Sequence, residues 1–292
     1  GVITSAGVGA GATVTVEGHG GNNAGTGSSN FGVYVFSANA RITSSGGAIS
    51  VTGSGTSNSE AVLLADSGAI ASGSAITITA DSVNIDASSD GIHSGSGQTT
   101  IRPRTAGTKI DLGGADVLVG SPLTLGLTSA EVNLITAGSL LIGRDDIATG
   151  TTTVSSEIAP IGSPALELIT ARDIVVGADL TAGSGGLTLR ANQQATATSG
   201  NFVGIDVNGT TVTTTGGGNV LLQGRGGDSG SNNIGVRVLG GGVVSGAGTV
   251  TVTGTGGSSA ANGNHGVWVA STTSQITSSG GAVSVTGTGG GA

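Results

Sequence analysis

The sequence predicts an all-β fold, a parallel β-helix whose coils of about 30 residues each contain three short strands. Residues 31–53 (FGVYVFSANARITSSGGAISVTG) return almost unchanged as residues 265–287 (HGVWVASTTSQITSSGGAVSVTG), at an offset of 234 (265 − 31). Apolar-polar-apolar triplets recur between these two blocks, and 59 of the 292 residues are glycine. Repetition of this kind is typical of solenoids, in which each coil packs on its neighbours.

Three series of triplets define the predicted coil. The first series reads Leu187–Leu189, Val220–Leu222, Val250–Val252 and Val283–Val285. The second series begins at Gly204, Gly235 and Gly266, which follow one another at an offset of 31 (235 − 204 and 266 − 235). The N-terminal copies of this second series are Gly32–Val35, Ala61–Leu64 and Gly91–His93. The third series, as in Arg41–Thr43 and Gln275–Thr277, precedes a Gly-Gly turn.

These strands favour a parallel helix over hairpins. A hairpin turns within two to five residues and pairs each strand with the next one in sequence. Here like strands recur a whole coil apart, so each strand is expected to pair with its copy in the next coil. Val, Ile, Leu and Ala then form internal columns, while glycine supplies positive φ angles at the corners.

The chain is predicted to form one continuous solenoid over residues 1–292. Residues 1–109 and 192–292 form glycine-rich coils with long loops, and residues 110–191 are richer in Leu and Ile. In that middle segment Asn133–Gly143 is echoed by Glu167–Gly177. Neither end of the sequence shows an amphipathic cap, so we expect self-contact, either by covalent continuation or by head-to-tail stacking on another subunit.

Composition excludes several classes of function. The net charge is −8 with a single lysine, so the basic stripe of a nucleic-acid-binding protein is absent. No apolar run reaches the roughly 18 residues of a membrane span, and membrane insertion is not expected. Without cysteine the chain has no thiolate metal site, and its three histidines, His19, His93 and His265, are far apart in sequence. We therefore predict no cofactor and no metal.

The middle segment carries a family resemblance. The run Leu168–Gly183 (LITARDIVVGADLTAG) and the strands Gly186–Leu189 and Gly281–Val285 resemble the repeats of filamentous-haemagglutinin-type and autotransporter-like bacterial adhesins. The resemblance implies a right-handed β-helix that is secreted, lies at the bacterial cell surface and serves cell adhesion. The secretion domain of that family is not seen in this sequence.

One candidate contact surface is the outward column of the second strand. It is predicted to contain Tyr34, Leu63 and His93 in the N-terminal third and Asp206, Arg237 and Trp268 in the C-terminal third. Adjacent coils place such side chains about one strand spacing apart. Asp206 and Arg237 are expected to form an ion pair, and Arg237 a cation–π contact with Trp268. The column either contacts a glycan or protein partner or simply fixes the register of the coils.

A second candidate surface is formed by long loops at one position of the coil: Gly18–Asn30, Asn192–Asn201, Gln223–Asn233 and Gly254–Asn264. Insertions at one position map to one face of a solenoid. The expected surface contacts are asparagines: Asn22, Asn23, Asn232, Asn233, Asn262 and Asn264. Neutral amides suit a cell-surface glycan or self-contact, and several copies raise avidity. The alternative is that the loops are merely tolerated expansions.

The expected function is therefore non-enzymatic, a structural or adhesive rod in an extracellular filament or giant surface protein. A polysaccharide-processing β-helix enzyme is the alternative, and it requires carboxylates gathered in a cleft beside an Arg or Lys. The acidic residues Asp111, Asp116, Asp145, Asp146, Asp173 and Asp179 show no such spacing. An ice-binding solenoid is less expected, because Arg190, Leu221 and Gln223 interrupt the outward threonine array of the first strand.

Overall fold

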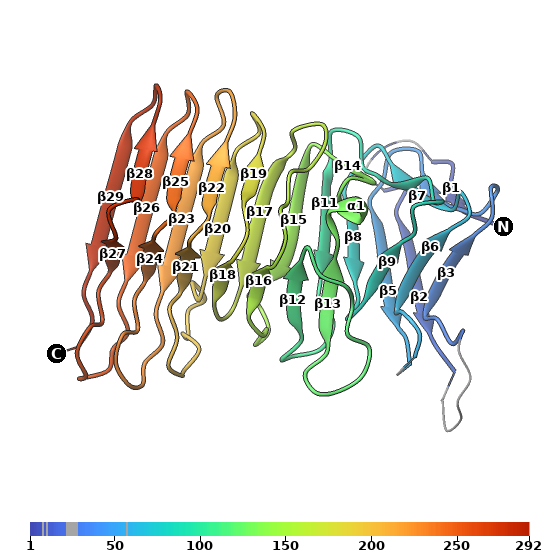
Figure 1. Cartoon of the computed structure of the whole chain (residues 1–292). Coiled ribbons are helices and arrows are strands. Elements are labelled where there is room, and N and C mark those ends of the chain that lie inside the picture. The colour runs from blue at the N-terminus through green and yellow to red at the C-terminus, as the bar shows by residue number, and fades with distance from the viewer. Residues whose placement is uncertain (8, 10, 22–28, 57, 292) are drawn as a thin grey trace. The chain divides into compact units, whose positions relative to one another are not determined.

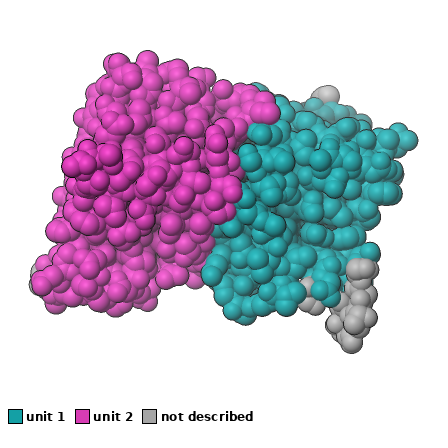
Figure 2. Space-filling model, in the orientation of Figure 1, with its two compact units in different colours: residues 1–142 teal, residues 143–292 magenta. Residues whose placement is uncertain are grey.

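A computed structural model describes residues 1–7, 9, 11–21, 29–56 and 58–291. It confirms the all-β prediction, since the ladders between named strands are parallel and pair each strand with its counterpart one coil away, as in a parallel β-helix (Figure 1). The chain divides into two compact units, residues 1–142 and 143–292 (Figure 2). The Leu- and Ile-rich segment 110–191 contributes residues to both units.

Unit 1 contains three strand series. The first comprises β2 (Val14–His19), β5 (Ile49–Ser54), β8 (Ile76–Thr79), β11 (Gln98–Arg102) and β15 (Ser139–Arg144). The second comprises β3 (Val33–Phe36), β6 (Val62–Ala65) and β9 (Val83–Ile85). The third comprises β1 (Val2–Ser5), β4 (Arg41–Ser44), β7 (Ala69–Ser72), β10 (Gly91–His93) and β14 (Ile135–Thr136). A further parallel pair joins β12 (Lys109–Leu112) to β13 (Thr124–Leu127).

Unit 2 repeats the same three series. The first comprises β17 (Ala165–Thr170), β20 (Leu187–Ala191), β23 (Val220–Arg225), β26 (Val250–Thr255) and β29 (Val283–Thr288). The second comprises β16 (Thr152–Val154), β18 (Ile174–Val176), β21 (Ile205–Asn208), β24 (Val236–Leu239) and β27 (Val267–Ala270). The third comprises β19 (Leu180–Ala182), β22 (Thr211–Thr214), β25 (Gly242–Ser245) and β28 (Gln275–Ser278).

Strand register gives the length of each coil. In unit 2 the first-series partners follow one another at offsets of 21 (187 − 166), 33 (220 − 187), 30 (250 − 220) and 33 (283 − 250). In unit 1 the partners Ile49 and Ile76 are offset by only 27 (76 − 49), and Ile76 and Thr99 by only 23 (99 − 76). The predicted coil length of about 30 residues therefore holds from β20 onward in unit 2. Elsewhere it is only an average, because the connections between strands differ more in length.

The core consists of aliphatic columns that run from coil to coil. Val51, Ile78, Ile101 and Ile142 are fully buried and are paired in register on β5, β8, β11 and β15. Burial alternates along β5, where buried and half-buried residues follow one another without interruption. Each buried Val or Ile contributes about 1.5–3 kcal/mol relative to an exposed one, and the column repeats that gain in every coil.

The corner after the third strand explains the repeated Ile-Thr-Ser-Ser-Gly-Gly block. Ser44 is buried, its Oγ donates to the carbonyl of Ala12 in the preceding coil (2.6 Å), and it accepts from the N–H of Gly47 (3.0 Å). Ser278 makes the same pair of bonds with the Gly248 carbonyl and the Gly281 N–H, both at 2.7 Å. The corner thus needs a small hydroxyl residue followed by a tight turn.

A single-turn helix, α1 (Ser129–Val132), has no counterpart among the predicted elements. Its N-cap Thr128 accepts from the N–H of Glu131, and the Glu131 carboxylate accepts from the Thr128 N–H at 2.8 Å. This reciprocal pair is a capping box, which satisfies two helix-terminal donors at once. The carboxylate of Glu131 also accepts from the N–H of Ile85 (3.1 Å) and so ties α1 to β9.

Candidate functional site

The long loops of unit 2 are held by buried asparagines. Asn233 is fully buried, and its Oδ1 accepts from the N–H of Phe202 in the preceding coil (2.9 Å). Its Nδ2 donates to the carbonyls of Ser229 (2.8 Å) and Gly230 (3.0 Å) within its own loop. One side chain therefore fixes the fold of its loop and joins that loop to the coil before it.

Asn264 repeats this arrangement one coil later. Its Oδ1 accepts from the N–H of Asn233 (2.9 Å), and its Nδ2 donates to the carbonyls of Ser259 (2.7 Å) and Ala261 (2.8 Å). The structure corrects the predicted surface position of Asn233 and Asn264, which are 0% and 6% exposed. An amide at this position satisfies backbone groups that the turn leaves unpaired, and so it is drawn into the interior.

Glycines let these loops lie directly on one another. A Cβ added at Gly227 would overlap the carbonyl oxygen of Gly200, and one added at Gly257 would overlap that of Gly227. Backbone hydrogen bonds join the loops, as between the N–H of Asn232 and the carbonyl of Asn262 (3.0 Å). The stacked loops of unit 2, residues 192–201, 223–233 and 254–264, are called the loop ridge below.

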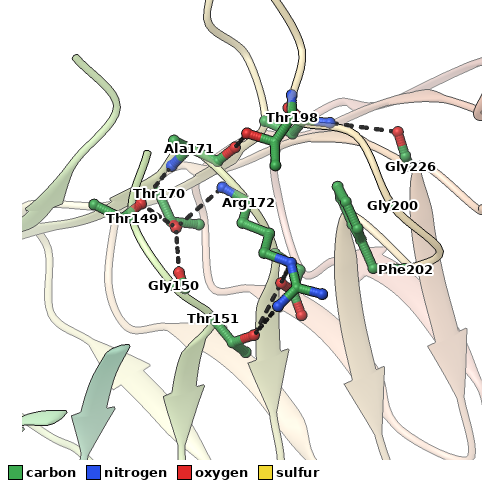
Figure 3. Close-up of polar contacts among 12 residues, drawn as sticks. Thr149, Gly150, Thr151, Thr170, Ala171, Arg172, Thr198, Gly200, Phe202 and Gly226 are labelled. Carbon is green, nitrogen blue, oxygen red and sulfur yellow. Dashed lines mark hydrogen bonds and ion pairs between the residues drawn. The ribbon is translucent and has the colours of Figure 1, made fainter. Parts of the chain in front are cut away.

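The first loop of the ridge is fixed to the coil beneath it by side chains (Figure 3). The Oγ1 of Thr198 donates to the carbonyl of Ala171 (2.6 Å), and the buried Asn192 accepts from the Thr198 N–H at 2.7 Å. Below the loop the guanidinium of Arg172 lies 5.3 Å from the ring centre of Phe202, within cation–π range. The ridge is therefore an ordered surface in its first loop as well.

The exposed part of the ridge carries amides and one carboxylate, Asp228, which accepts from the N–H of Gly200 at 2.8 Å. Asn232 and Asn262 are exposed, as their predicted role requires. Asn232 has a φ of 61°, a left-handed conformation that asparagine tolerates better than most residues. Asn22 and Asn23, the asparagines predicted for the N-terminal loop, lie outside the described residues. The candidate polar contacts of the ridge are thus those of unit 2.

The outward column of unit 2 forms in the predicted register, with Asp206 opposite Arg237 and Arg237 opposite Trp268. Arg237 binds the Asp206 carboxylate through both Nε (2.7 Å) and Nη2, and this partner raises the pKa of Arg237. Asp206 is only 8% exposed, so the pair is largely desolvated and unsuited to capture a ligand. Among the described residues no cation–π contact joins Arg237 to Trp268, whose ring instead stacks on His265 at 6.5 Å.

The column of unit 1 differs from the prediction. Tyr34 is 47% exposed and pairs with Leu63, but Leu63 pairs next with Asn84 of β9. His93 lies in β10 of the third series, opposite Ala71 and Thr136. The prediction for His93 is wrong because the coils there are short. Tyr34 instead belongs to an aromatic cluster with half-buried Phe31 (4.9 Å between ring centres) and exposed Phe36 (5.1 Å).

A groove in unit 1 gathers carboxylates that the sequence keeps far apart. A cavity of about 350 Å³ is lined by Glu60, Asp86, Asp116 and Glu131, together with Leu118 and Thr128. Asp116 accepts from the N–H of Gly126 (2.6 Å), yet burial, reinforced by the charges of Glu131 and Glu60, raises its pKa to about 8. The Asp116 carboxyl is therefore protonated at neutral pH, beside the Glu131 carboxylate.

Sequence reasoning selected Asp116 but missed Glu60, Asp86 and Glu131, which also line the groove. In the sequence, the capping box Thr128-Ser129-Ala130-Glu131 could have indicated a helix start and a structural role for Glu131. The remaining predicted acids lie elsewhere, and three of them have structural partners. Asp179 accepts from Thr210 and Thr211, which lowers its pKa, and Asp173 pairs with Arg172 at 3.4 Å. Asp146 binds Arg144, and the adjacent Asp145 and the more distant Asp111 do not line the groove.

Metal and membrane functions gain no support from the described residues. Within them no group of three or more His, Asp or Glu side chains is placed to hold a metal ion. The same residues contain no helix that is long and apolar enough to cross a membrane. No family model, no curated protein and no solved structure matches this chain.

Proposed function

We propose that this chain is a structural or adhesive segment of a secreted filament or giant surface protein, located outside the cell on a bacterial surface. It acts through multivalent contacts along its stacked coils, with a cell-surface glycan or protein as partner. The observation that supports this proposal is the loop ridge, in which buried Asn233 and Asn264 hold loops that expose amides in adjacent coils. The likeness of residues 168–183 to adhesin repeats agrees with it.

Preorganisation is the physical advantage of such a ridge. Ordering a polar side chain on binding costs about 0.5–1.5 kcal/mol, and a ligand must overcome that cost at every contact. Here the loop backbones are already joined by hydrogen bonds such as Gly257 N–H to Asn233 carbonyl (2.8 Å). Each contact is weak, but a repeating ligand engages several loops at once, and its avidity rises with their number.

The proposal is tested by measuring attachment of the purified chain to intact cells and to an array of cell-surface glycans. The ridge variant combines Asn232→Gly and Asn262→Ala, which remove exposed amides. Glycine is chosen at position 232 because it accepts the positive φ without strain. We expect at least a tenfold loss of attachment through lost avidity. The control combines Thr215→Ala with Thr272→Ala, two exposed residues of unit 2 outside the ridge.

Equal attachment of the ridge variant and the control would contradict the proposed role of the ridge. Absence of attachment by the unmodified chain to every cell and glycan tested would contradict adhesion and leave only a structural role. Circular dichroism spectra of both variants should match that of the unmodified chain, since the altered side chains are exposed.

The carboxylate groove of unit 1 supports a second candidate, polysaccharide processing. General acid catalysis at neutral pH needs a carboxyl group that remains protonated, and burial of Asp116 provides one beside Glu131. No Arg or Lys is among the described residues that line the groove, so the expected cation is missing. Incubation with acidic and neutral polysaccharides, followed by assay of new reducing ends, tests this candidate. Turnover that survives Asp116→Asn would exclude Asp116 as the acid.

A further inference from the structure

A second cavity in unit 1 differs in chemistry from the carboxylate groove, because an arginine lines it. Its volume is about 380 Å³, within the range of about 300–1,000 Å³ that small-molecule sites occupy. The lining comes from the three connections that follow β5, β8 and β11, and from residues 118–123 of the loop between β12 and β13. This cavity is called the Arg104 cavity below.

The cavity exists because the middle one of the three connections is short. Residues 80–82 join β8 to β9, whereas residues 55–61 join β5 to β6 and residues 103–108 join β11 to β12. The short connection forms the floor, and the two longer connections form opposite walls. In unit 2 the connections at the same position of the coil are all long and stack on one another as the loop ridge.

Two side chains of the floor hold the walls in place. The Asp81 carboxylate accepts from the N–H of Arg104 (3.0 Å) and from the N–H (2.8 Å) and hydroxyl (2.6 Å) of Thr105. On the other side the Oγ of Ser82, a buried residue, accepts from the N–H of Ala61 (2.8 Å). The wall donors engage both oxygens of Asp81, so this carboxylate has a structural role and the cavity is preorganised.

Arg104 brings an uncompensated positive charge to the cavity. Its side chain is exposed, and among the described residues no carboxylate lies within ion-pair distance of it. Four other arginines each pair with an aspartate: Arg41, Arg144, Arg172 and Arg237. A guanidinium binds a carboxylate through two parallel hydrogen bonds, so Arg104 is suited to an acidic ligand.

The remaining lining suits a sugar ring, which has C–H groups on its faces and hydroxyls at its edge. Leu118, Val119 and Leu123 supply an apolar wall, and Val119 is 62% exposed. The hydroxyl of Thr105 donates to Asp81 and therefore keeps its lone pairs for a ligand hydroxyl. The cavity thus offers one cation, one apolar wall and hydroxyl acceptors.

We propose that the Arg104 cavity binds a uronic acid residue of a polysaccharide, with the sugar carboxylate on the Arg104 guanidinium and a ring face against Val119. A phosphate ester carries nearly two negative charges, whereas the lining supplies one cation beside the Asp81 carboxylate, so a singly charged carboxylate fits better. The inference rests on the proposed glycan-binding function and names the glycan as acidic.

The test measures binding of a galacturonic acid trimer to the purified chain by isothermal titration calorimetry, with a galactose trimer as the neutral probe. We expect the unmodified chain to bind the acidic trimer at least tenfold more tightly than the neutral one. Arg104→Gln should weaken binding of the acidic trimer about 10- to 100-fold, because a charge-assisted hydrogen-bonded pair is lost. Arg190→Gln removes the same charge from β20, outside the cavity and the ridge, and should bind normally.

A second pair of variants tests the apolar wall. Val119→Asp sets a carboxylate beside that of the ligand and should weaken binding of the acidic trimer at least tenfold through like-charge repulsion. Val117→Asp makes the same change in the same loop but outside the lining, and should bind normally. Both valines are exposed, so circular dichroism spectra should match that of the unmodified chain.

Equal affinity of the unmodified chain for the two trimers would overturn the inference, as would equal affinity of Arg104→Gln and Arg190→Gln for the acidic trimer. The ridge variant, Asn232→Gly with Asn262→Ala, should bind the acidic trimer normally, because both positions lie outside the cavity. Trimer binding by a chain that attaches to no cell would contradict adhesion only. Cell attachment without trimer binding would contradict the Arg104 cavity only.

Discussion

Replacement of Asn233 by alanine tests whether one buried amide holds the loop ridge together. The substitution removes the acceptor of the Phe202 N–H and the donors to the Ser229 and Gly230 carbonyls. Phe202 is 8% exposed, so its amide has little access to water. The two carbonyls belong to exposed residues, and water replaces the lost donors there.

The expected loss follows from these surroundings. An unsatisfied buried donor costs about 1–3 kcal/mol, and two partly solvated hydrogen bonds add about 1 kcal/mol together. The free energy of unfolding should therefore fall by about 2–4 kcal/mol. Since each 1.4 kcal/mol is a factor of ten, the Phe202 amide should exchange its hydrogen roughly 30- to 1000-fold faster. Hydrogen exchange is the appropriate assay because solenoids open locally.

Two further variants test whether the effect comes from the buried amide of Asn233 itself. Asn262→Ala removes an exposed amide from the neighbouring loop and should change stability by no more than about 0.5 kcal/mol. Asn233→Asp keeps an acceptor for Phe202 but sets a carboxylate against two carbonyls, so it should destabilise the ridge at neutral pH. Equal exchange at Phe202 in Asn233→Ala and Asn262→Ala would refute the argument that the buried amide fixes the loop.

Three other outcomes are expected. Burial raises the pKa of Asp116 from 3.8 to about 8, so the folded state binds the proton more tightly and stability falls as the pH rises between these values, by at most about 5 kcal/mol. Asp116→Asn should reduce this slope in urea midpoints measured at pH 4, 6 and 8, and the pKa of Asp173, which burial also raises, leaves a slope of the same sign. Arg237→Met leaves the Asp206 carboxylate buried and unpaired and should cost about 2–4 kcal/mol in urea unfolding, whereas Asp206→Leu with Arg237→Met should cost much less. Ser44→Ala should lower stability by about 1–2 kcal/mol in thermal unfolding, and Ser45→Ala, next to it but exposed, should not.

Each of these expectations has a contradicting result. A urea midpoint of the unmodified chain that rises between pH 4 and 8 would contradict a protonated Asp116. A double variant at positions 206 and 237 that is as unstable as Arg237→Met would show that lost packing, rather than an unpaired charge, causes the destabilisation. Equal melting temperatures of Ser44→Ala and Ser45→Ala would contradict the explanation that the Ser44 hydroxyl stabilises the repeated corner.

The parallel β-helix could be predicted because each coil repeats the same local requirements. The evenly spaced glycines Gly204, Gly235 and Gly266 set the register of unit 2, and with it the column of Asp206, Arg237 and Trp268. Register failed in unit 1, where the coil from Ile76 to Thr99 is short and the triplet containing His93 falls into another series. Strand triplets alone do not identify their series when the connections change length.

The echo between Asn133–Gly143 and Glu167–Gly177 shows the same limit. Ile135 lies in β14, in the third series of unit 1, and pairs with Ile92. Ile169 lies in β17, in the first series of unit 2, and pairs with Arg190. Any half-buried strand followed by a corner satisfies the pattern, so similar sequences occupy different positions in the coil.

The carboxylate groove was beyond sequence reasoning for a different reason. Glu60 and Asp116 are far apart in sequence, and they meet only because unit 1 places α1 and β13 beside the loop that precedes β6. A raised pKa arises from desolvation, which depends on the packed structure rather than on neighbours in sequence. The capping box could have located Glu131, but not its position beside Asp116.

Residues 232 and 233 show how stability and contact are divided within the ridge. They are consecutive asparagines, and from sequence both were expected at the surface. The turn sends Asn233 inward to satisfy backbone groups of two coils, while Asn232, with its left-handed backbone, remains exposed. Changes at position 232 should therefore alter attachment at constant stability. Changes at position 233 should alter attachment only through loss of loop order. A ridge built this way can vary its exposed residues from coil to coil without losing the hydrogen bonds that keep the coils stacked.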